Sequence, residues 1–210
     1  MSQVRPSPAK RARPAMPVVY GPRRQAGFSL TEVAIAIAVV LIISIVGLPA
    51  INGYVLESRV TAVATELQRF IGRTKVMGEG ASITPYADID NEKNLAPALV
   101  DSTVFRVTGS VVAHRLGGRG SGTDGTLTLE PADLGSGGTG SAFALTATNV
   151  NERACPILAS LLHAVSEAMA INGTVVKTLG TDNAQGSYNP VAAQEACTRG
   201  DTNEFTFTTR

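Results

Sequence analysis

Residues 23–55 read RRQAGFSLTEVAIAIAVVLIISIVGLPAINGYV and place one carboxylate, Glu32, in a long apolar run. The run from Phe28 to Ile51 contains 24 residues and no other charge. A helix of about 20 apolar residues crosses the hydrocarbon core of a bilayer. The apolar part of an ordinary secretory signal has only about 7–15 residues. The sequence therefore predicts a transmembrane helix over residues 28–51.

The charges on either side of this run predict its orientation. Residues 1–27 contain six of the 18 Lys and Arg residues and no acid, which leaves 12 basic residues against 17 acidic ones in the rest of the chain. A basic flank stays on the cytoplasmic side, so we expect the following residues to cross the membrane. The basic segment also contains five prolines and is a poor candidate for folded structure. A nucleic-acid-binding arm would fit its composition, but a solvated charge run is commoner, and no direct nucleic-acid site is evident.

Glu32 needs a physical reason, because a carboxylate in a membrane segment costs a few kcal/mol unless it is paired. The next basic residue along the chain is Arg59, far beyond the reach of Glu32. A cut between Gly27 and Phe28 would create an amine close to Glu32, in the same chain or in a neighbouring one. The alternative is an interfacial residue that is solvated by headgroups at the membrane edge.

The sequence RRQAG followed by FSLTE resembles the processing site of type IV prepilins. That site has a basic leader ending in glycine, a hydrophobic residue at the new N-terminus and glutamate at the fifth mature position. The resemblance implies cleavage after Gly27 by a prepilin peptidase, N-methylation of Phe28 and assembly into a filament. It also implies that Glu32 pairs with the Phe28 amine of an adjacent subunit. A charge pair buried in this way fixes register more than it adds net stability.

The resemblance divides the chain into a cleaved leader, residues 1–27, a long N-terminal helix, residues 28–77, and a globular head, residues 78–210. The long leader and the large cysteine-bounded loop are similar to the type IVb pilins. Phe28 at the mature N-terminus departs from that subclass, because phenylalanine is more typical of type IVa pilins. The fold implied is the pilin fold, an α+β structure in which the long helix packs on an antiparallel β-sheet.

The long helix changes character along its length. Between Tyr54 and Met77 the apolar residues recur at intervals of three and four, which indicates an amphipathic helix that packs one stripe on the head. That stripe contains Val60, Val63, Leu67, Phe70 and Ile71. We expect the helix to end at Gly78 and Gly80. Gly47 and Pro49 interrupt the first half, since proline removes a backbone hydrogen bond. The resemblance favours local melting there when subunits enter a filament, although an ordinary membrane-helix proline is the alternative.

The head sequence alternates between short strands and glycine-rich connections. A second helix is predicted over residues 153–173, with Asn172-Gly173 at its end. The loop residues Asp88, Asp90 and Glu92 could hold calcium, but Lys93 and Leu99 occupy positions where an EF-hand needs glycine and glutamate. We therefore expect no metal. The predicted strands are STVFRV (102–107), SVVAHR (110–115), GTLTLE (125–130), SAFALTAT (141–148), TVVKTL (174–179) and NEFTFTTR (203–210).

The two cysteines, Cys155 and Cys197, both follow the apolar run and so are expected in an oxidising compartment. Their number and position predict one disulfide, which would stabilise the head by roughly 4 kcal/mol in the chain-entropy model. The alternative is two free thiols. By resemblance, residues 155–197 form the variable D-region, which faces outward on a filament and meets other pili, cells or phage.

The remaining sequence carries little catalytic chemistry. His114 and His163 lie in separate predicted elements, and no phosphate-binding loop, metal-ligand cluster or nucleophile elbow is present. We therefore expect no enzyme activity and no cofactor. The alternative of a membrane-anchored binding protein predicts that Glu32 is dispensable.

The function expected is that of a structural subunit of a bacterial type IV pilus, used for adhesion, aggregation, conjugation or motility. A minor pilin or a type II secretion pseudopilin is the alternative. The partners expected are further copies of the chain, the prepilin peptidase and methyltransferase, the inner-membrane assembly machinery, and host or recipient cell surfaces. The chain is expected in the inner membrane before assembly and in an extracellular pilus afterwards.

Overall fold

The computed structural model describes residues 27–180 and 186–210, and the side chains of residues 46–52 lie outside that description. Internal contacts divide the chain into two units that meet between Ser44 and Ile45. We call residues 45–210 the head unit, because they contain the sheet and the core. The long helix α1, Leu30–Gly78, begins in the first unit and ends in the second.

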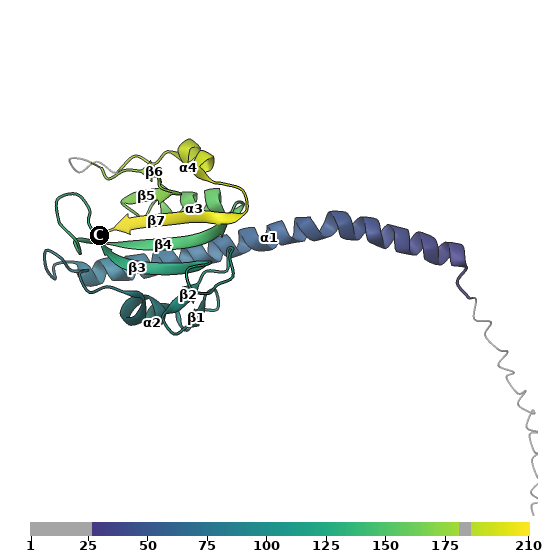
Figure 1. Ribbon diagram of the computed structural model, residues 1–210, viewed down its shortest axis with the longest axis horizontal. Helices are drawn as coiled ribbons and strands as arrows, with labels where there is room; N and C mark the ends of the chain where they lie inside the picture. Colours follow the sequence, from purple (N-terminus) through teal and green to yellow (C-terminus); the bar gives the residue numbers. More distant parts are fainter. Residues whose placement is uncertain (1–26, 181–185) are drawn as a thin grey trace, which may run out of the picture. The chain divides into compact units, whose positions relative to one another are not determined.

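The head unit is built on an antiparallel sheet of seven strands among the described residues, in the order β1-β2-β3-β4-β7-β5-β6 (Figure 1). The last strand in the chain, β7, thus lies between β4 and β5 in the middle of the sheet. The strands are β1 Arg106–Thr108, β2 Val111–Ala113, β3 Thr126–Ala132, β4 Ala142–Asn151, β5 Ala168–Ile171, β6 Thr174–Lys177 and β7 Asp201–Thr209.

Alternation of side chains gives the central strands two different faces. In β7, Phe205 and Phe207 are fully buried and their rings stack with centroids 5.4 Å apart. They pair across the ladder with Ala147 and Leu145 of β4, which are also buried. The threonine between them, Thr206, points to the opposite, partly exposed face, as the period of two along a strand requires.

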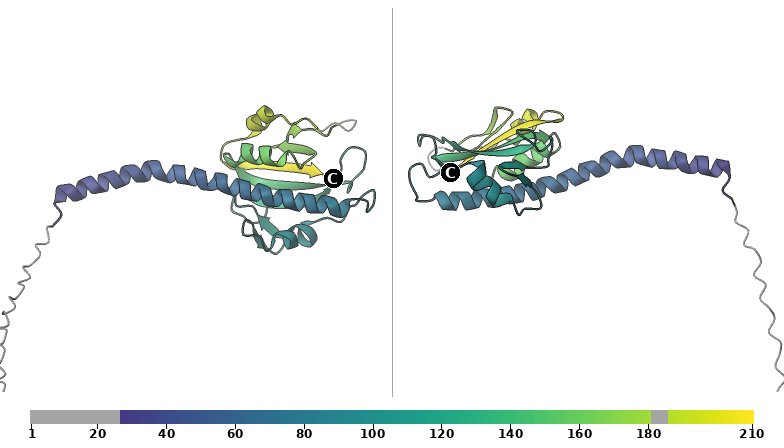
Figure 2. Two further views of the ribbon diagram at one scale, coloured as in Figure 1. Left: turned by 180° about the vertical axis from the view of Figure 1, so that it is seen from behind. Right: turned by 60° about the horizontal axis from the view of Figure 1, so that its bottom comes forward.

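The apolar face of the sheet is covered by helices. Seen from behind, α1 and α3 (Ala154–Leu162) lie on the same face (Figure 2, left). The amide of Gln68 in α1 donates a 2.7 Å hydrogen bond to the carbonyl oxygen of Leu161 in α3. All five residues of the predicted α1 stripe are at most 5% exposed, which confirms the stripe. Burying each large apolar side chain of this kind contributes about 1.5–3 kcal/mol.

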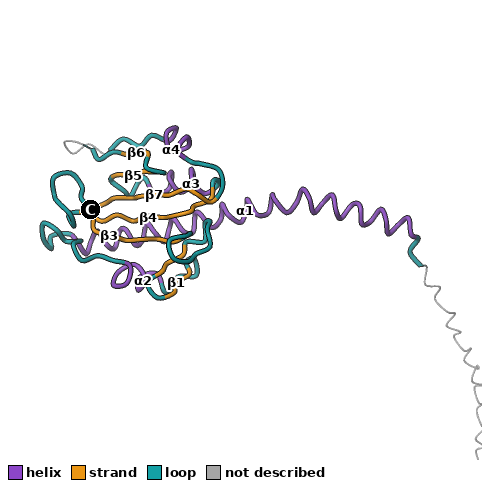
Figure 3. Tube along the Cα trace, in the orientation of Figure 1, coloured by secondary structure: helices purple, strands orange, loops and turns teal. Residues whose placement is uncertain are grey.

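α1 ends where the sequence predicts, at Gly78. A Cβ on Gly78 would lie 2.3 Å from the hydroxyl oxygen of Tyr86, so a larger residue there would displace the ring. Gly80 then adopts φ +75, a left-handed conformation that glycine reaches without strain. A short π-helical turn, η1 (Asn91–Leu95), and α2 (Ala96–Leu99) follow the loop and lead into the first strands (Figure 3).

The second predicted helix is only half correct. The α-helix α3 ends at Leu162, and residues 168–171 form strand β5 instead. Met169 and Ile171 are buried while Ala168 and Ala170 are half-buried, which is the alternation of a strand. Asn172 and Gly173 have φ of +50 and +77 and join β5 to β6 as a two-residue hairpin turn. An Asn-Gly pair is a strong hairpin signal, and it determines the structure here.

The disulfide between Cys155 and Cys197 is present, with the two Cα atoms 6.0 Å apart. It joins the first turn of α3 to the end of α4 (Pro190–Ala196), a helix that the sequence analysis did not predict. Pro190 occupies the first turn, and the side chain of Asn189 accepts hydrogen bonds from the Val191 and Ala192 N–H groups. An asparagine cap followed by proline is a helix-start signal that the sequence does contain.

Asn203 ties the disulfide-bounded segment to the centre of the sheet. This fully buried amide donates to the carbonyl oxygens of Val150 at 3.0 Å and Thr198 at 2.9 Å. Its Oδ1 atom accepts from the Thr198 N–H at 2.7 Å and from the Asn172 amide at 2.9 Å. The Asn172 amide also donates to the carbonyl oxygen of Ala196. Asn203 therefore connects β4 and β7 to the β5–β6 turn and to the segment after α4.

We expect Asn203→Ala to lower the free energy of unfolding by about 2–4 kcal/mol, because it leaves several buried polar groups without partners. Chemical denaturation of the full chain in a nonionic detergent measures this loss. Glu204→Ala is the matched control, because Glu204 is exposed and its backbone N–H still donates to Asn172. Equal stability of Asn203→Ala and the unsubstituted chain would contradict the role of the network.

Candidate functional site

Residues 27–32 build the start of α1. Ser29 lies directly before the helix, and its hydroxyl oxygen accepts a 3.2 Å hydrogen bond from the backbone N–H of Glu32. Serine is a favoured N-cap residue because it satisfies one of the unpaired N–H groups at a helix start. The spacing Ser-x-x-Glu is that of a capping box. The Ser29 cap was not predicted, although the Ser-x-x-Glu spacing indicates it.

Glu32 occupies the first turn of α1 and is exposed. Its backbone contacts Ser29, but its carboxylate forms no hydrogen bond or ion pair within the described residues. The N-terminal end of a helix carries partial positive charge, which favours an acid at this position. The carboxylate is therefore compatible with the helix start and remains available to a partner outside the chain.

The first half of α1 has no polar face between Val33 and Ile43. The large apolar side chains of residues 30–45 are all exposed, from 43% for Val33 to 90% for Leu30. Residues 39–43 are five consecutive aliphatic positions, and successive positions differ by about 100° around a helix. A helix that is apolar on every side needs an apolar environment on every side.

Across the described residues, no helix contains a stretch that is both long enough and apolar enough to span a membrane.

Gly47 and Pro49 lie inside α1, whose backbone is helical from Leu30 to Gly78. Their side chains fall outside the described set. Proline has no N–H to donate to the carbonyl four residues earlier, so one helical hydrogen bond cannot form there. Local melting at Gly47 and Pro49 in an assembled state stays a prediction.

Gly27 is not required by the chain's own structure. A Cβ built on Gly27 meets no atom within 4 Å, and Gly27 is not among the glycines with positive φ. Phe28 beside it is 80% exposed. Any requirement for glycine at this position must therefore come from another molecule that binds the segment.

No metal is expected at the loop of Asp88, Asp90 and Glu92, and one of these acids caps a helical turn. Asp90 caps η1 by accepting a 2.7 Å hydrogen bond from the Lys93 N–H. That bond is the main reason why the pKa of Asp90 lies below its ordinary value. No group of three or more potential metal ligands occurs among the described residues.

The two histidines lie apart, as expected. His163 follows α3 and packs against the ring of Tyr188, with centroids 4.5 Å apart. His114 is 1% exposed, and its Nε2–H donates to the carbonyl oxygen of Thr148 at 2.7 Å. Its Nδ1 atom accepts a 3.0 Å hydrogen bond from the Leu116 N–H. This pattern requires a neutral ring, so His114 supports the turn after β2.

Comparison with known proteins agrees with these features. Residues 57–210 match the sequence model of a family described as PilS N terminal. Residues 22–48 match the prokaryotic N-terminal methylation motif. The chain belongs to the type IV pilin family. The long helix packed on an antiparallel sheet is accordingly the pilin fold, as predicted.

Two solved pilins are similar to this pilin. The type IVb pilin from Salmonella typhi is 21% identical, and the match covers 71% of this chain and 96% of that one, with a TM-score of 0.46. TcpA, a type IV pilin from Vibrio cholerae El Tor biotype, is 14% identical, with 74% and 99% covered and a TM-score of 0.44. No curated protein sequence matches the pilin.

The pilin should lose stability in mild acid because of His114. Burial is the main cause that lowers the pKa of His114 below 6.5, while the Thr148 carbonyl and the charge of Asp201 act in the opposite direction. The folded state therefore resists protonation that the unfolded state accepts. Stability is complete above about pH 6.5 and falls below it, by at most about 1.4 kcal/mol per pH unit. It levels off below the lowered pKa.

Denaturant titrations of the full chain in nonionic detergent, between pH 7.5 and 5, measure this slope. His114→Gln should flatten it. His163→Gln is the comparison, because it changes the other histidine, which is only partly buried. A slope that persists unchanged in His114→Gln would assign the effect to another group.

Proposed function

We propose that this pilin is the major structural subunit of a type IV pilus, and that it polymerises through the first half of α1. The observation that carries the proposal is the combination of an all-round apolar helix with one carboxylate near its start, Glu32, which has no side-chain partner among the described residues. Such a helix is stable in a bilayer or inside a bundle of similar helices. The bilayer would surround the helix before assembly, and the filament core would surround it afterwards.

Processing would precede assembly. The methylation motif spans Gly27 and Phe28, and a cut between them would leave an amine three residues before Thr31 and four before Glu32. We propose that a prepilin peptidase makes this cut, removes residues 1–27 and methylates Phe28. Residues 28–51 would hold the precursor in the inner membrane until assembly. Neither the new amine nor Glu32 is stable alone in apolar surroundings, so pairing between subunits would offset both penalties.

The sheet and the helices packed on it would form the outside of the filament. The disulfide-bounded residues 155–197 include α3, the β5–β6 hairpin and α4. We propose that they act as the D-region, which meets other pili, recipient cells or host cells. A minor pilin or a secretion pseudopilin would share the same chemistry. Sheared surface filaments in which this chain is the dominant band, beginning at methylated Phe28, would favour the major subunit.

Gly27→Val should leave an uncleaved, membrane-held precursor. The reason is that the chain itself tolerates a side chain at position 27, so the change affects only recognition by the peptidase. Immunoblotting for the mass of the chain and N-terminal sequencing check the cut. Gly72→Val is the matched control, because a Cβ on Gly72 also meets nothing within 4 Å and the residue lies far from the cut. Normal maturation of Gly27→Val would place the processing site elsewhere.

Glu32→Ala should insert, be cleaved and fold, but should fail to assemble alone. The Ser29 cap survives, because it uses the backbone N–H of residue 32. Electron microscopy of cells that express only the variant should show no filaments, while co-expression with the unsubstituted chain should allow mixed ones. Glu57→Ala removes an exposed carboxylate farther along α1 and should assemble normally. Abundant filaments of normal diameter from Glu32→Ala alone would rule out the pairing role.

A further inference from the structure

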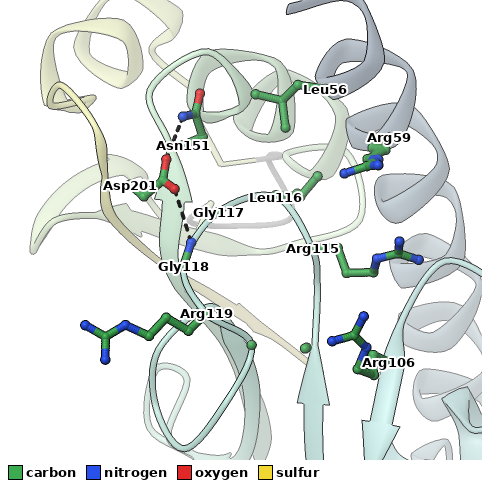
Figure 4. Close-up of a pocket in the computed structure, with 12 residues that line it drawn as sticks. Leu56, Arg59, Arg106, Arg115, Leu116, Gly117, Gly118, Arg119, Asn151 and Asp201 are labelled. Carbon is green, nitrogen blue, oxygen red and sulfur yellow. Dashed lines mark hydrogen bonds between the residues drawn. The ribbon is translucent and has the colours of Figure 1, made fainter. Parts of the chain in front are cut away.

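A cavity of about 360 Å³ lies beside α1, where the helix begins to pack on the core of the head unit. Residues of α1, of β1 and of the glycine-rich loop after β2 surround it (Figure 4). Its volume lies at the small end of the range for ligand sites. The cavity is lined by Leu56, Arg59, Arg106, Ala113, residues 115–120, Asn151 and Asp201.

Three of the four arginines at the cavity gather on one side of it. Figure 4 shows the guanidinium groups of Arg59, Arg106 and Arg115 on the side of α1, although they come from three separate elements. The fourth, Arg119, points the other way, and its Nε atom lies 3.5 Å from a carboxylate oxygen of Asp124. Arg119 therefore has its own counter-ion.

The three gathered guanidiniums have no such partner. Within residues 27–180 and 186–210, none of the three forms a hydrogen bond or an ion pair through its side chain. The one carboxylate that lines the cavity, on Asp201, is already engaged. Its oxygens accept from the Asn151 amide at 2.6 Å and from the Gly118 N–H at 3.3 Å. Like charges gathered without a counter-ion repel one another, so the cavity is set up for an anion.

Arg115 is held in an unusual backbone conformation. Its φ is +59, which is costly for a residue with a Cβ and is found mainly at functional sites and turns. The turn is fixed on both sides. The Leu116 N–H donates to His114, and the Leu116 carbonyl accepts from the Asn151 N–H at 3.0 Å. The residue after Leu116 must be glycine, because a Cβ on Gly117 would lie 2.3 Å from the Asn149 carbonyl oxygen.

The position of the cavity along α1 adds a second argument. Arg59 follows the end of the proposed membrane segment, Ile51, by eight residues, or about 12 Å of helix. The headgroup region extends about 5–7 Å beyond the hydrocarbon core, and side chains on a helix lean toward its N-terminus. An arginine at this position can therefore reach the phosphates of the membrane surface.

We propose that Arg59, Arg106 and Arg115 form a binding site for a phosphate group, and that in the membrane-held subunit the phosphate belongs to a phospholipid headgroup. The fork of an arginine matches the oxygens of a phosphate, and the arginines supply this fork from three directions. The lipid as the source of the phosphate rests on the proposed membrane-anchored pilin. The site itself rests on the head unit alone.

The test uses the full chain in dodecyl maltoside micelles, which contain no phosphate. The readout is the NMR signal of each arginine Nε–H group, during titration with inorganic phosphate in one arm and phosphatidylglycerol in the other. Both probes should shift the signals of Arg59, Arg106 and Arg115. The lipid should act at lower concentration, because it shares the micelle with α1. Raised salt should weaken both responses.

Arg115→Gly is the decisive variant. It removes one guanidinium and fits the positive φ without strain, so its melting temperature should be at least that of the unsubstituted pilin. Binding should weaken about tenfold to a hundredfold, as expected for the loss of a charge-assisted hydrogen bond. Arg119→Gln is the matched control, because it removes an equal charge from the same loop and should bind as before.

Each outcome decides the proposal. A response to inorganic phosphate without one to phosphatidylglycerol supports the site with free phosphate as its ligand and rejects the lipid. No shift with either probe, or equal weakening by Arg115→Gly and Arg119→Gln, overturns the site. Loss of filaments by Arg115→Gly with no phosphate response would also overturn it, and would assign the arginines to carboxylates of a neighbouring subunit. Because these readouts do not require filaments, they remain separate from the test of Glu32.

Discussion

The head unit depends on one hydrophobic core that includes both the apolar stripe of α1 and the phenylalanine pair of β7. Phe205 and Phe207 are fully buried, and helices cover that face of the sheet. Without α1, the sheet would expose a large apolar surface to water, which a stable soluble domain rarely does. The second half of α1 is therefore part of the head, although its sequence continues directly from an all-round apolar helix. One continuous element serves two environments, and the change from apolar on all sides to apolar on one stripe marks the boundary.

Sequence periodicity predicted most of this arrangement, and its failures have identifiable causes. The α1 stripe and six of the seven strands could be read because their alternation is strong. The predicted second helix extended too far, because an apolar residue such as Met169 fits both a helical stripe and a strand. Asn172-Gly173, predicted as a helix stop, is a hairpin turn. The N-cap at Ser29 could have been predicted from the Ser-x-x-Glu spacing but was not. The arginine cluster could not be predicted from the sequence. Arg59, Arg106 and Arg115 are far apart in the chain, and the segment that contains them has a net negative charge.

Two charged sites of opposite sign are thus connected with α1. Glu32 stands at its start with no partner in the described residues, and three unpaired guanidiniums gather where it joins the core. In each case the charge is not neutralised by any side chain within the described residues. All four side chains are exposed, so water solvates these charges until a partner binds them. The structural difference is that the Glu32 site is formed by six consecutive residues, whereas the cavity depends on a folded head.

The central place of β7 has a consequence for how the protein is made. A ribosome delivers residues 201–209 after every other strand, yet β4 and β5 both need β7 as their neighbour. The sheet therefore cannot close until residues 201–209 have been synthesised, and a chain that stops before residue 201 lacks the strand that joins β4 to β5. Apolar residues of β4 and β5 that are buried in the complete sheet would then lack their neighbouring strand. The order of the strands thus makes folding of the sheet depend on synthesis of the chain through β7.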